Sequence, residues 1–282
     1  MQISELNLDA VQKILPDRDP WGHKGCFGRI LLLCGSIGYT GAAYFSAMGA
    51  LRSGAGLVFL GVPESIYAIE AVKLNEPVVF PLPDCDGMIA KEAIPSILQR
   101  LPRMDAVLIG CGLGIGPDTE ALVGAVLEAA MCPVIVDADG ITLLKKHKDI
   151  VRGRTYPTIL TPHDGEFLRV GGLLGEDRMD SAAKFAREWN CIVLLKGHRT
   201  CITDGRAHYR NGTGNPGMAV GGSGDVLAGI IAGLLGQGLS ALEAAACGAW
   251  LHGAAGDLCA SEIGQYGMLP SDMLEALPRL LK

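Results

Sequence analysis

The run RILLLCGS at residues 29–36 is followed by the small-residue stretch GAAYFSAMGALRSG at 41–54 and by GLVFLGVP at 56–63. The first and third segments are short, continuously apolar and bounded by glycine, which is typical of strands that are buried on both faces of a sheet. The stretch between them has the length and the alanine content of a helix. This order of strand, helix and strand predicts an α/β protein with a parallel sheet.

The same alternation continues to the end of the chain. We expect a single domain over residues 1–282, whose mostly parallel sheet is covered by helices on both faces. A short amphipathic helix is expected within residues 1–16. Beyond the opening unit, the pattern predicts strands at 76–81, 106–114, 133–140, 158–165 and 191–197, and helices at 64–73, 89–100, 118–130, 177–189, 222–236 and 240–260.

Composition excludes several classes of protein. The chain is 49% hydrophobic and 19% charged, with a formal net charge of −6, so it has no basic surface for nucleic acid or anionic lipid. No apolar stretch is long enough to cross a membrane. The nine cysteines form no CxxC pair, and several lie in apolar runs, which indicates free thiols in a reducing compartment. Since the N-terminus also lacks the apolar core of a signal peptide, we expect a cytoplasmic protein.

Polar and glycine residues follow nearly every predicted strand. In open α/β sheets, ligands bind beyond the carboxyl ends of the strands, so these residues are the candidate site. The endings are CGS at 34–36, GCGLG at 110–114, DADG at 137–140, TPHDGE at 161–166 and LKG at 195–197.

The segment NPGMAVGGSGD at 215–225 opens the apolar helix predicted at 222–236. A glycine-rich turn at a helix N-terminus exposes unpaired amides to an anion, and glycine lets phosphate oxygens approach closely. We therefore expect Gly222, Ser223 and Gly224 to bind phosphate, and Asp225 to act as a base. The alternative is a flexible turn with Asp225 as a capping carboxylate.

Two commoner nucleotide motifs are disfavoured. GTGNPG at 212–217 matches GxGxxG, but it contains proline, lies late in the chain and lacks the acidic residue expected after it. No Gly-Lys dipeptide occurs, so there is no Walker A sequence.

Taken together, these motifs resemble the ribokinase-like superfamily and, more narrowly, the ADP/ATP-dependent NAD(P)H-hydrate dehydratases. The resemblance covers about residues 20–280 and implies a three-layer α/β/α sandwich. The matching motifs, in order, are the segment KGCFGRILLLCGSIGYTGAAYFSAMGALRSGAGLV at 24–58, GCGLG at 110–114, DADG at 137–140, TPHDGE at 161–166, KGHRT at 196–200, NGTGNPGMAVGGSGDVLAG at 211–229 and ALEAAACGAWLHGAAGD at 241–257.

The resemblance implies a repair reaction, in which the hydrates of NADH and NADPH (NADHX and NADPHX) are phosphorylated by ADP or ATP and then lose phosphate. Asp225 would be the catalytic base, and Mg²⁺ would accompany the nucleotide, although the sequence shows no ligand pair for it. By resemblance the enzyme is a homotetramer. The resemblance also implies a nucleotide site at Lys196, Gly197, His198, Arg199, Thr200, Gly222, Ser223 and Gly224, and a substrate site at Ala42, Gly114, His163 and Asp225.

Alternatives remain at several positions. His163 is also placed to cap the next helix, and a pair such as Asp137 and Asp139 more often orients loops than acts in catalysis. His252 lies in an apolar helix, where a core or interface position is the simpler interpretation. Val220 stands where many relatives have a small hydroxyl residue.

Two other functions remain open at this stage. A ribokinase-like kinase acting on a vitamin-precursor alcohol would share Asp225 and the glycine-rich turn. A nucleotide sensor would be expected to lose Asp225 or its flanking glycines. Since about twenty residues precede the first motif, we expect a standalone dehydratase, with the epimerase that some relatives carry supplied elsewhere.

Overall fold

The computed structural model describes residues 3–281 of the chain. Its main feature is a ten-stranded sheet in the order β1-β12-β11-β10-β9-β8-β7-β2-β3-β4. The strands of this sheet are β1 (Ser4–Glu5), β2 (Arg29–Leu33), β3 (Leu57–Pro63), β4 (Val78–Leu82), β7 (Ala106–Ile109), β8 (Val134–Val136), β9 (Thr158–Leu160), β10 (Ile192–Leu195), β11 (Cys201–Thr203) and β12 (His208–Arg210).

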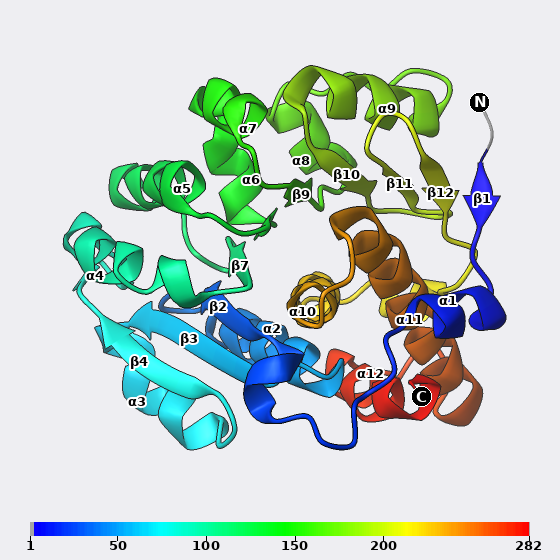
Figure 1. Ribbon diagram of the computed structural model, residues 1–282, viewed down its shortest axis with the longest axis horizontal. Helices are drawn as coiled ribbons and strands as arrows, with labels where there is room; N and C mark the ends of the chain where they lie inside the picture. The colour runs from blue at the N-terminus through cyan, green and yellow to red at the C-terminus, as the bar shows by residue number, and fades with distance from the viewer. Residues whose placement is uncertain (1–2, 282) are drawn as a thin grey trace.

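From β4 across to β10 every neighbouring pair is parallel, as the sequence predicts. The strand β11 runs antiparallel to β10 and β12. At the edge, β1 pairs with β12 in parallel, which Figure 1 shows as a blue arrow beside the end of the sheet. The prediction of a mostly parallel α/β sheet is confirmed.

Helices cover both faces of the sheet, in a three-layer α/β/α arrangement (Figure 1). Alternate residues of β2 face opposite sides: Ile30 and Leu32 pack in one core, and Leu31 and Leu33 in the other. The helices are α1 (Leu8–Ile14), α2 (Thr40–Arg52), α3 (Glu64–Lys73), α4 (Ile94–Leu98), α5 (Pro117–Ala129), α6 (Asp139–Leu143), α7 (Lys148–Gly153), α8 (Asp164–Arg169), α9 (Arg178–Trp189), α10 (Ser223–Gly236), α11 (Ala241–Glu262) and α12 (Pro270–Ala276).

The helix predicted at 89–100 is shorter than expected. Lys91–Ala93 forms a 3-10 helix that leads directly into α4 at Ile94–Leu98, so the prediction holds for residues 91–98. Its first residue, Ile89, belongs instead to β6 (Met88–Ile89), which pairs with β5 (Asp84–Cys85). The turn between these two strands is the pair Asp86 and Gly87, both with positive φ, which is the backbone that a tight hairpin requires.

Helices α2 and α10 approach each other through small residues. A Cβ on Gly49 would lie 2.6 Å from the carbonyl oxygen of Val226, and one on Gly229 would lie 2.3 Å from that of Ser46. Glycine at these positions allows backbone-to-backbone contact between the two helices. The position of α10, and with it the GGSGD turn, is thus fixed by the core.

Among residues 3–281, no helix combines the length and the apolar character needed to cross a membrane.

The contact between α2 and α10 gives a stability prediction. Gly229→Ala places a methyl group against the backbone of Ser46 and Ala50, which cannot move aside as a side chain can. We expect overpacking of about 1–3 kcal/mol and a fall in Tm of roughly 3–10 °C by calorimetry. Gly153→Ala in α7, where a Cβ meets open space, is the control and should leave Tm unchanged or slightly raised. An equal Tm for both variants would contradict the packing.

Candidate active site

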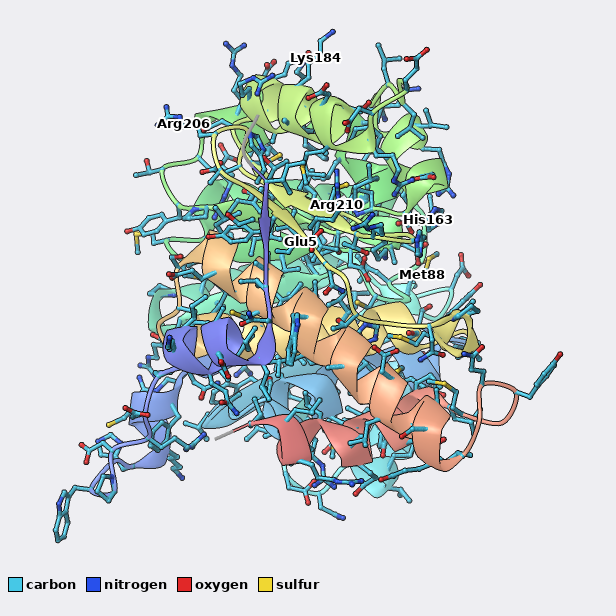
Figure 2. The ribbon with its side chains drawn as sticks, turned by 90° about the vertical axis from the view of Figure 1, so that its right-hand side faces the viewer. Glu5, Met88, His163, Lys184, Arg206 and Arg210 are labelled. Carbon is cyan, nitrogen blue, oxygen red and sulfur yellow. The ribbon has the colours of Figure 1, made fainter. Side chains whose placement is uncertain are left out.

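The carboxyl ends of β2, β7, β8, β9 and β10 bring their polar loops to one edge of the sheet, where the N-terminus of α10 also lies. Figure 2 shows His163, which follows β9, and Met88 of the β5–β6 hairpin on the same edge of the molecule. This is the edge at which the sequence predicts ligand binding.

A buried ion pair lies at the centre of this edge. The Nζ atom of Lys196 is 2.8 Å from Oδ1 of Asp137 and 3.7 Å from Oε2 of Glu166. Asp137 also accepts a 2.6 Å hydrogen bond from Thr161 Oγ1 and a 3.5 Å one from Cys111 Sγ. Burial lowers the pKa of Lys196, but the two carboxylates offset this, so its pKa lies above the ordinary value. Lys196 is therefore a fixed cation and not a surface lysine.

The two acidic residues of DADG have different roles. Asp139 accepts a 2.9 Å hydrogen bond from the amide of Gly114 and holds the GCGLG loop, as the loop-orienting interpretation expects. Asp137, 1% exposed, instead pairs with Lys196 inside the site. Between them Ala138 has a φ of 48°, a backbone rare outside glycine, and this turn is what aims the two carboxylates apart.

Asp225 lies in the first turn of α10, close to the ion pair. Burial and, next, the charge of Asp137 raise the pKa of Asp225 to about 7, against opposing contributions from the Cys111 thiol and from Lys196. A carboxyl group with a pKa near 7 is well matched to proton transfer at neutral pH. This geometry suits a base better than a capping carboxylate.

The GGSG turn has the open backbone that an anion site needs. Gly222 has a φ of 97°, which favours glycine, and a Cβ on Gly224 would lie 3.5 Å from Nζ of Lys196. The amide of Ser223 donates to the carbonyl of Val220 at 3.3 Å. The first hydrogen bond of helix α10 is donated by the amide of Val226, so the amides of Gly224 and Asp225 come before it in the helix. The amide of Ser223 is thus used within the turn, which leaves the amides of Gly224 and Asp225 and the Ser223 hydroxyl as the candidate donors to phosphate.

A cavity of about 920 Å³ opens beside this turn. Its walls include most of the residues predicted to bind nucleotide, and its volume suits a nucleotide-sized ligand. Gly222, also predicted to bind nucleotide, does not line it. The lining residues that the sequence predicts are Lys196, Gly197, His198, Arg199, Thr200, Ser223, Gly224 and, from the predicted substrate site, His163.

His163 both caps a helix and faces the cavity. Its Nδ1 atom accepts hydrogen bonds from the amides of Gly165 and Glu166 at the start of α8, so the alternative of a helix cap is confirmed. Since Nδ1 is the acceptor, the proton of a neutral ring lies on Nε2, which is 3.3 Å from Oε1 of Glu166. Capping thus fixes the ring without removing it from the cavity.

The other predicted substrate residues lie outside this cavity. Ala42, in α2, contacts the GCGLG loop, because a Cβ on Gly112 would lie 2.8 Å from Cβ of Ala42. Gly114 lies against Met88, whose sulfur would be 2.4 Å from a Cβ at that position. These residues border the site on the side of β7, whereas the cavity lies on the side of β10.

Several residues of the site were missed by the sequence prediction. Asn211 donates to the carbonyls of Thr213 and Ala249, and Asp257 accepts from Gly214 and Asn215, so these two residues shape the loop that lines the cavity. His252, expected in the core or an interface, lines the cavity and has its Nε2 atom 3.2 Å from Ser223 Oγ. The partners in these contacts lie far apart in the sequence, so no local sequence pattern could have indicated them.

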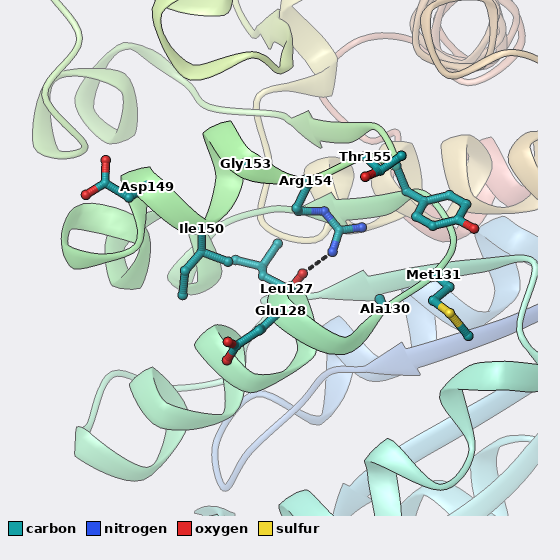
Figure 3. A pocket seen from close by; sticks show the side chains of 10 residues that line it. Leu127, Glu128, Ala130, Met131, Asp149, Ile150, Gly153, Arg154 and Thr155 are labelled. Atoms are coloured by element: carbon teal, nitrogen blue, oxygen red, sulfur yellow. Dashed lines mark hydrogen bonds between the residues drawn. The ribbon is translucent and has the colours of Figure 1, made fainter.

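A second, smaller pocket of about 410 Å³ lies at the opposite edge, before β8 and β9 (Figure 3). There Arg154 donates to the backbone carbonyls of Leu127 and Cys132, which joins the end of α5 to the segment before β9. Because this pocket lies at the amino ends of the strands, it is not where α/β sheets bind their ligands.

Among the described residues, Cys111, Asp137 and Asp225 place one ligand atom each within 4.8 Å of one another. The two carboxylates are suitable ligands for Mg²⁺, whereas a thiol is not, and Lys196 already neutralises Asp137. The donor set thus fits Mg²⁺ through carboxylate oxygens alone, with the remaining ligands supplied by a nucleotide and water.

The fold is that of the ribokinase-like superfamily, whose member from Enterococcus faecalis superposes with a TM-score of 0.87 at 29% identity, over 98% of this chain and 94% of that one. The model of the NAD(P)H-hydrate dehydratase family matches residues 30–279. The chain belongs to this family.

Two relatives show how the match extends. A bifunctional NAD(P)H-hydrate repair enzyme, Nnr, from Moorella thermoacetica is 46% identical over 95% of this chain and 52% of that protein. The ADP/ATP-dependent NAD(P)H-hydrate dehydratase from Bacillus subtilis, co-crystallised with ATP and Mg²⁺, is 31% identical with a TM-score of 0.84, over 99% of this chain and 98% of that one. This chain spans about half the length of the bifunctional relatives that it matches.

The raised pKa of Asp225 predicts a pH-dependent difference in stability. The unfolded carboxyl has a pKa of about 4, so the folded state holds its proton to higher pH and wild-type stability falls as pH rises through about 7. We expect Asp225→Asn to become more stable relative to the wild type between about pH 4 and 7, with no further change above this range. Denaturant unfolding at several pH values measures this.

Asp9→Asn is the matched control, because Asp9 occupies the first turn of α1 but is exposed. If the stability of Asp225→Asn relative to the wild type varied with pH no more than that of Asp9→Asn, the carboxyl of Asp225 would not be desolvated.

Proposed function

We propose that this chain restores NADH and NADPH from their hydrates by a nucleotide-driven dehydration. The observation that carries the proposal is the position of Asp225 at the N-terminus of α10: its carboxylate lies within 4.8 Å of that of Asp137, which pairs with Lys196, and the preceding residue, Gly224, lines a cavity of about 920 Å³. Membership of the dehydratase family and the names of the relatives supply the reaction.

In the first step, the hydroxyl oxygen of the hydrate attacks the terminal phosphorus of the nucleotide. Asp225 accepts the hydroxyl proton, a new O–P bond forms, and the bond from phosphorus to the leaving nucleotide breaks. With its pKa near 7, Asp225 is deprotonated often enough at neutral pH to act, yet remains basic enough to bind a proton.

The site contributes fixed positive charge and donors to this step. The amides of Gly224 and Asp225 lie at the positive end of the α10 dipole, and Nζ of Lys196 lies beside Gly224. In such a position they stabilise negative charge on the transferring phosphoryl group without reorganising. The ion pair with Asp137 holds Lys196 there before any ligand binds.

In the second step, the phosphorylated hydrate loses phosphate. The C–O bond breaks with phosphate as the leaving group, a proton is lost from the neighbouring carbon, and the ring double bond returns. The net reaction is the loss of water driven by nucleotide hydrolysis, so the enzyme is a carbon–oxygen lyase.

The nucleotide belongs in the cavity beside α10. Met218, Val220, Leu227 and Ala249 give one part of it an apolar lining, as a nucleobase requires, and residues 196–200 give the polar part. Val220, 40% exposed, lies on this wall. The donor is ADP or ATP, with ADP our preference, and both place a phosphoryl group at Gly224.

Mg²⁺ would be held by the nucleotide phosphates together with carboxylate oxygens of Asp225 or Asp137. When bound, it neutralises phosphate charge. The co-crystallisation of the Bacillus relative with ATP and Mg²⁺ supports the presence of Mg²⁺ with the nucleotide.

The proposal includes a cytoplasmic homotetramer. The free cysteines support the proposed location, because a reducing compartment keeps thiols unpaired. The tetramer is proposed from the resemblance alone. Helix α11 packs its apolar surface against α10 and α12 of the same chain, so this surface does not require a second copy to cover it.

The role of Asp225 gives a direct activity test. With ATP or ADP, Mg²⁺ and hydrated NADH, the wild type should restore the absorbance of NADH. Asp225→Asn should lower turnover by about 10²-fold or more, because the base is lost, while the affinity for nucleotide stays nearly intact. Asp9→Asn is the control and should be fully active, because Asp9 is exposed on α1.

Unchanged turnover in Asp225→Asn would remove the base assignment. Failure of the wild type to restore NADH, combined with phosphorylation of a vitamin-precursor alcohol to a stable ester, would show that the chain is a small-molecule kinase instead. Binding of nucleotide with neither activity would indicate a sensor.

A further inference from the structure

Two buried polar side chains face each other across helices α10 and α11 at the cavity wall. Ser223 opens α10 and is 7% exposed; His252, in α11, is 8% exposed. The Ser223 Oγ and His252 Nε2 atoms are 3.2 Å apart, and both residues line the cavity together with Gly224. The rest of the histidine's surroundings on α11 is largely apolar, with Leu251 fully buried beside it.

The histidine is neutral at physiological pH. Burial lowers the pKa of His252 to about 4, although a backbone interaction at Ser223 acts in the opposite direction, and the cation of Lys196 lowers the pKa further. A neutral imidazole carries one proton, so Nε2 either donates to Ser223 Oγ or accepts from it.

The surroundings of Ser223 distinguish these two arrangements. Its amide already donates to the carbonyl of Val220, so the hydroxyl is the group that Ser223 can offer to the cavity. A phosphoryl oxygen accepts hydrogen bonds only. If Ser223 gave its proton to His252, it would present lone pairs to the phosphate, and this would be repulsive.

We infer that His252 is a positioning residue of the phosphate site: its Nε2–H donates to Ser223 Oγ, so that the hydroxyl proton of Ser223 points into the cavity and donates to a phosphoryl oxygen. Each hydrogen bond of this relay polarises the next, which strengthens the contact with the anion. The relay also explains a buried histidine in an apolar helix, and a serine among glycines. The nature of the ligand rests on the proposed function, but the Ser223–His252 contact does not.

The test measures the dissociation constants of ATP with Mg²⁺, and of adenosine, by calorimetry or competition. Ser223→Ala should weaken ATP binding about ten-fold or more, since a hydrogen bond to a charged group is lost. His252→Leu should weaken it about five- to ten-fold, because the hydroxyl remains but is no longer oriented. Adenosine has no phosphate, so its binding should stay within about two-fold of the wild type in both variants.

His252→Gln should rescue binding to within about three-fold, because its amide nitrogen can replace the Nε2–H donor. In the Ser223→Ala background, His252→Leu should have no further effect, since the two residues act in series. His208→Leu is the matched control: His208 is also buried, at 7% exposure, and contacts the Thr203 hydroxyl at 2.8 Å, but lies in β12 outside the cavity. It should leave ATP affinity unchanged.

Equal losses of ATP and adenosine affinity in His252→Leu, or independent effects of His252 and Ser223, would show a structural role and overturn the inference. If His252→Leu does not fold, Ser223→Ala and His252→Gln decide: loss in the first with retention in the second supports the relay, and any other combination contradicts it. Binding is measured without the hydrate, so these outcomes are distinguishable from failure of the proposed dehydration. That failure would appear as intact nucleotide binding without recovery of NADH.

Discussion

The ion pair between Asp137 and Lys196 joins the carboxyl ends of β8 and β10, and through Thr161 it also includes the end of β9. Asp137 is almost fully buried, so the pair exists only because the surrounding hydrogen bonds compensate for the loss of water. The same carboxylate raises the pKa of Asp225, and the same ammonium lies beside Gly224. One buried interaction thus sets the surroundings both of Asp225, the proposed base, and of the proposed anion site.

This arrangement depends on where α10 begins. The glycines that bring α10 against α2 fix the axis of the helix, and the turn before Ser223 fixes its first amides. An anion site made from backbone donors tolerates little movement, because its strength comes from donors that are already oriented. In the proposed mechanism, the close packing of the two helices therefore contributes to the chemistry as well as to the stability.

Much of this was predictable from local sequence. The runs at 29–36, 56–63 and 191–197 gave strands, and the GGSGD segment gave the N-terminus of a helix within one residue of its observed start. These predictions succeed because a buried parallel strand and a glycine-rich helix start each leave a continuous pattern. The strands β11 and β12, with the sequences CIT and HYR, contain polar residues and so leave no continuous apolar run.

The contacts that define the chemistry were harder to predict. Asp137 was expected to orient loops, and its pairing with Lys196 spans 59 residues, so only the strand order reveals it. The contact of His252 with Ser223 likewise depends on how α11 crosses α10. Residue types in a motif predict a kind of site, whereas the direction of each side chain is set by tertiary packing.

The central claim, that the N-terminus of α10 receives the transferable phosphoryl group beside Asp225, is tested most directly by a crystal structure of the chain with ATP and Mg²⁺. The account predicts the base in the cavity lined by residues 196–200 and the terminal phosphate within hydrogen-bond distance of the Gly224 amide, on the same side as the Asp225 carboxylate. A nucleotide bound with its phosphates directed away from α10 would contradict it.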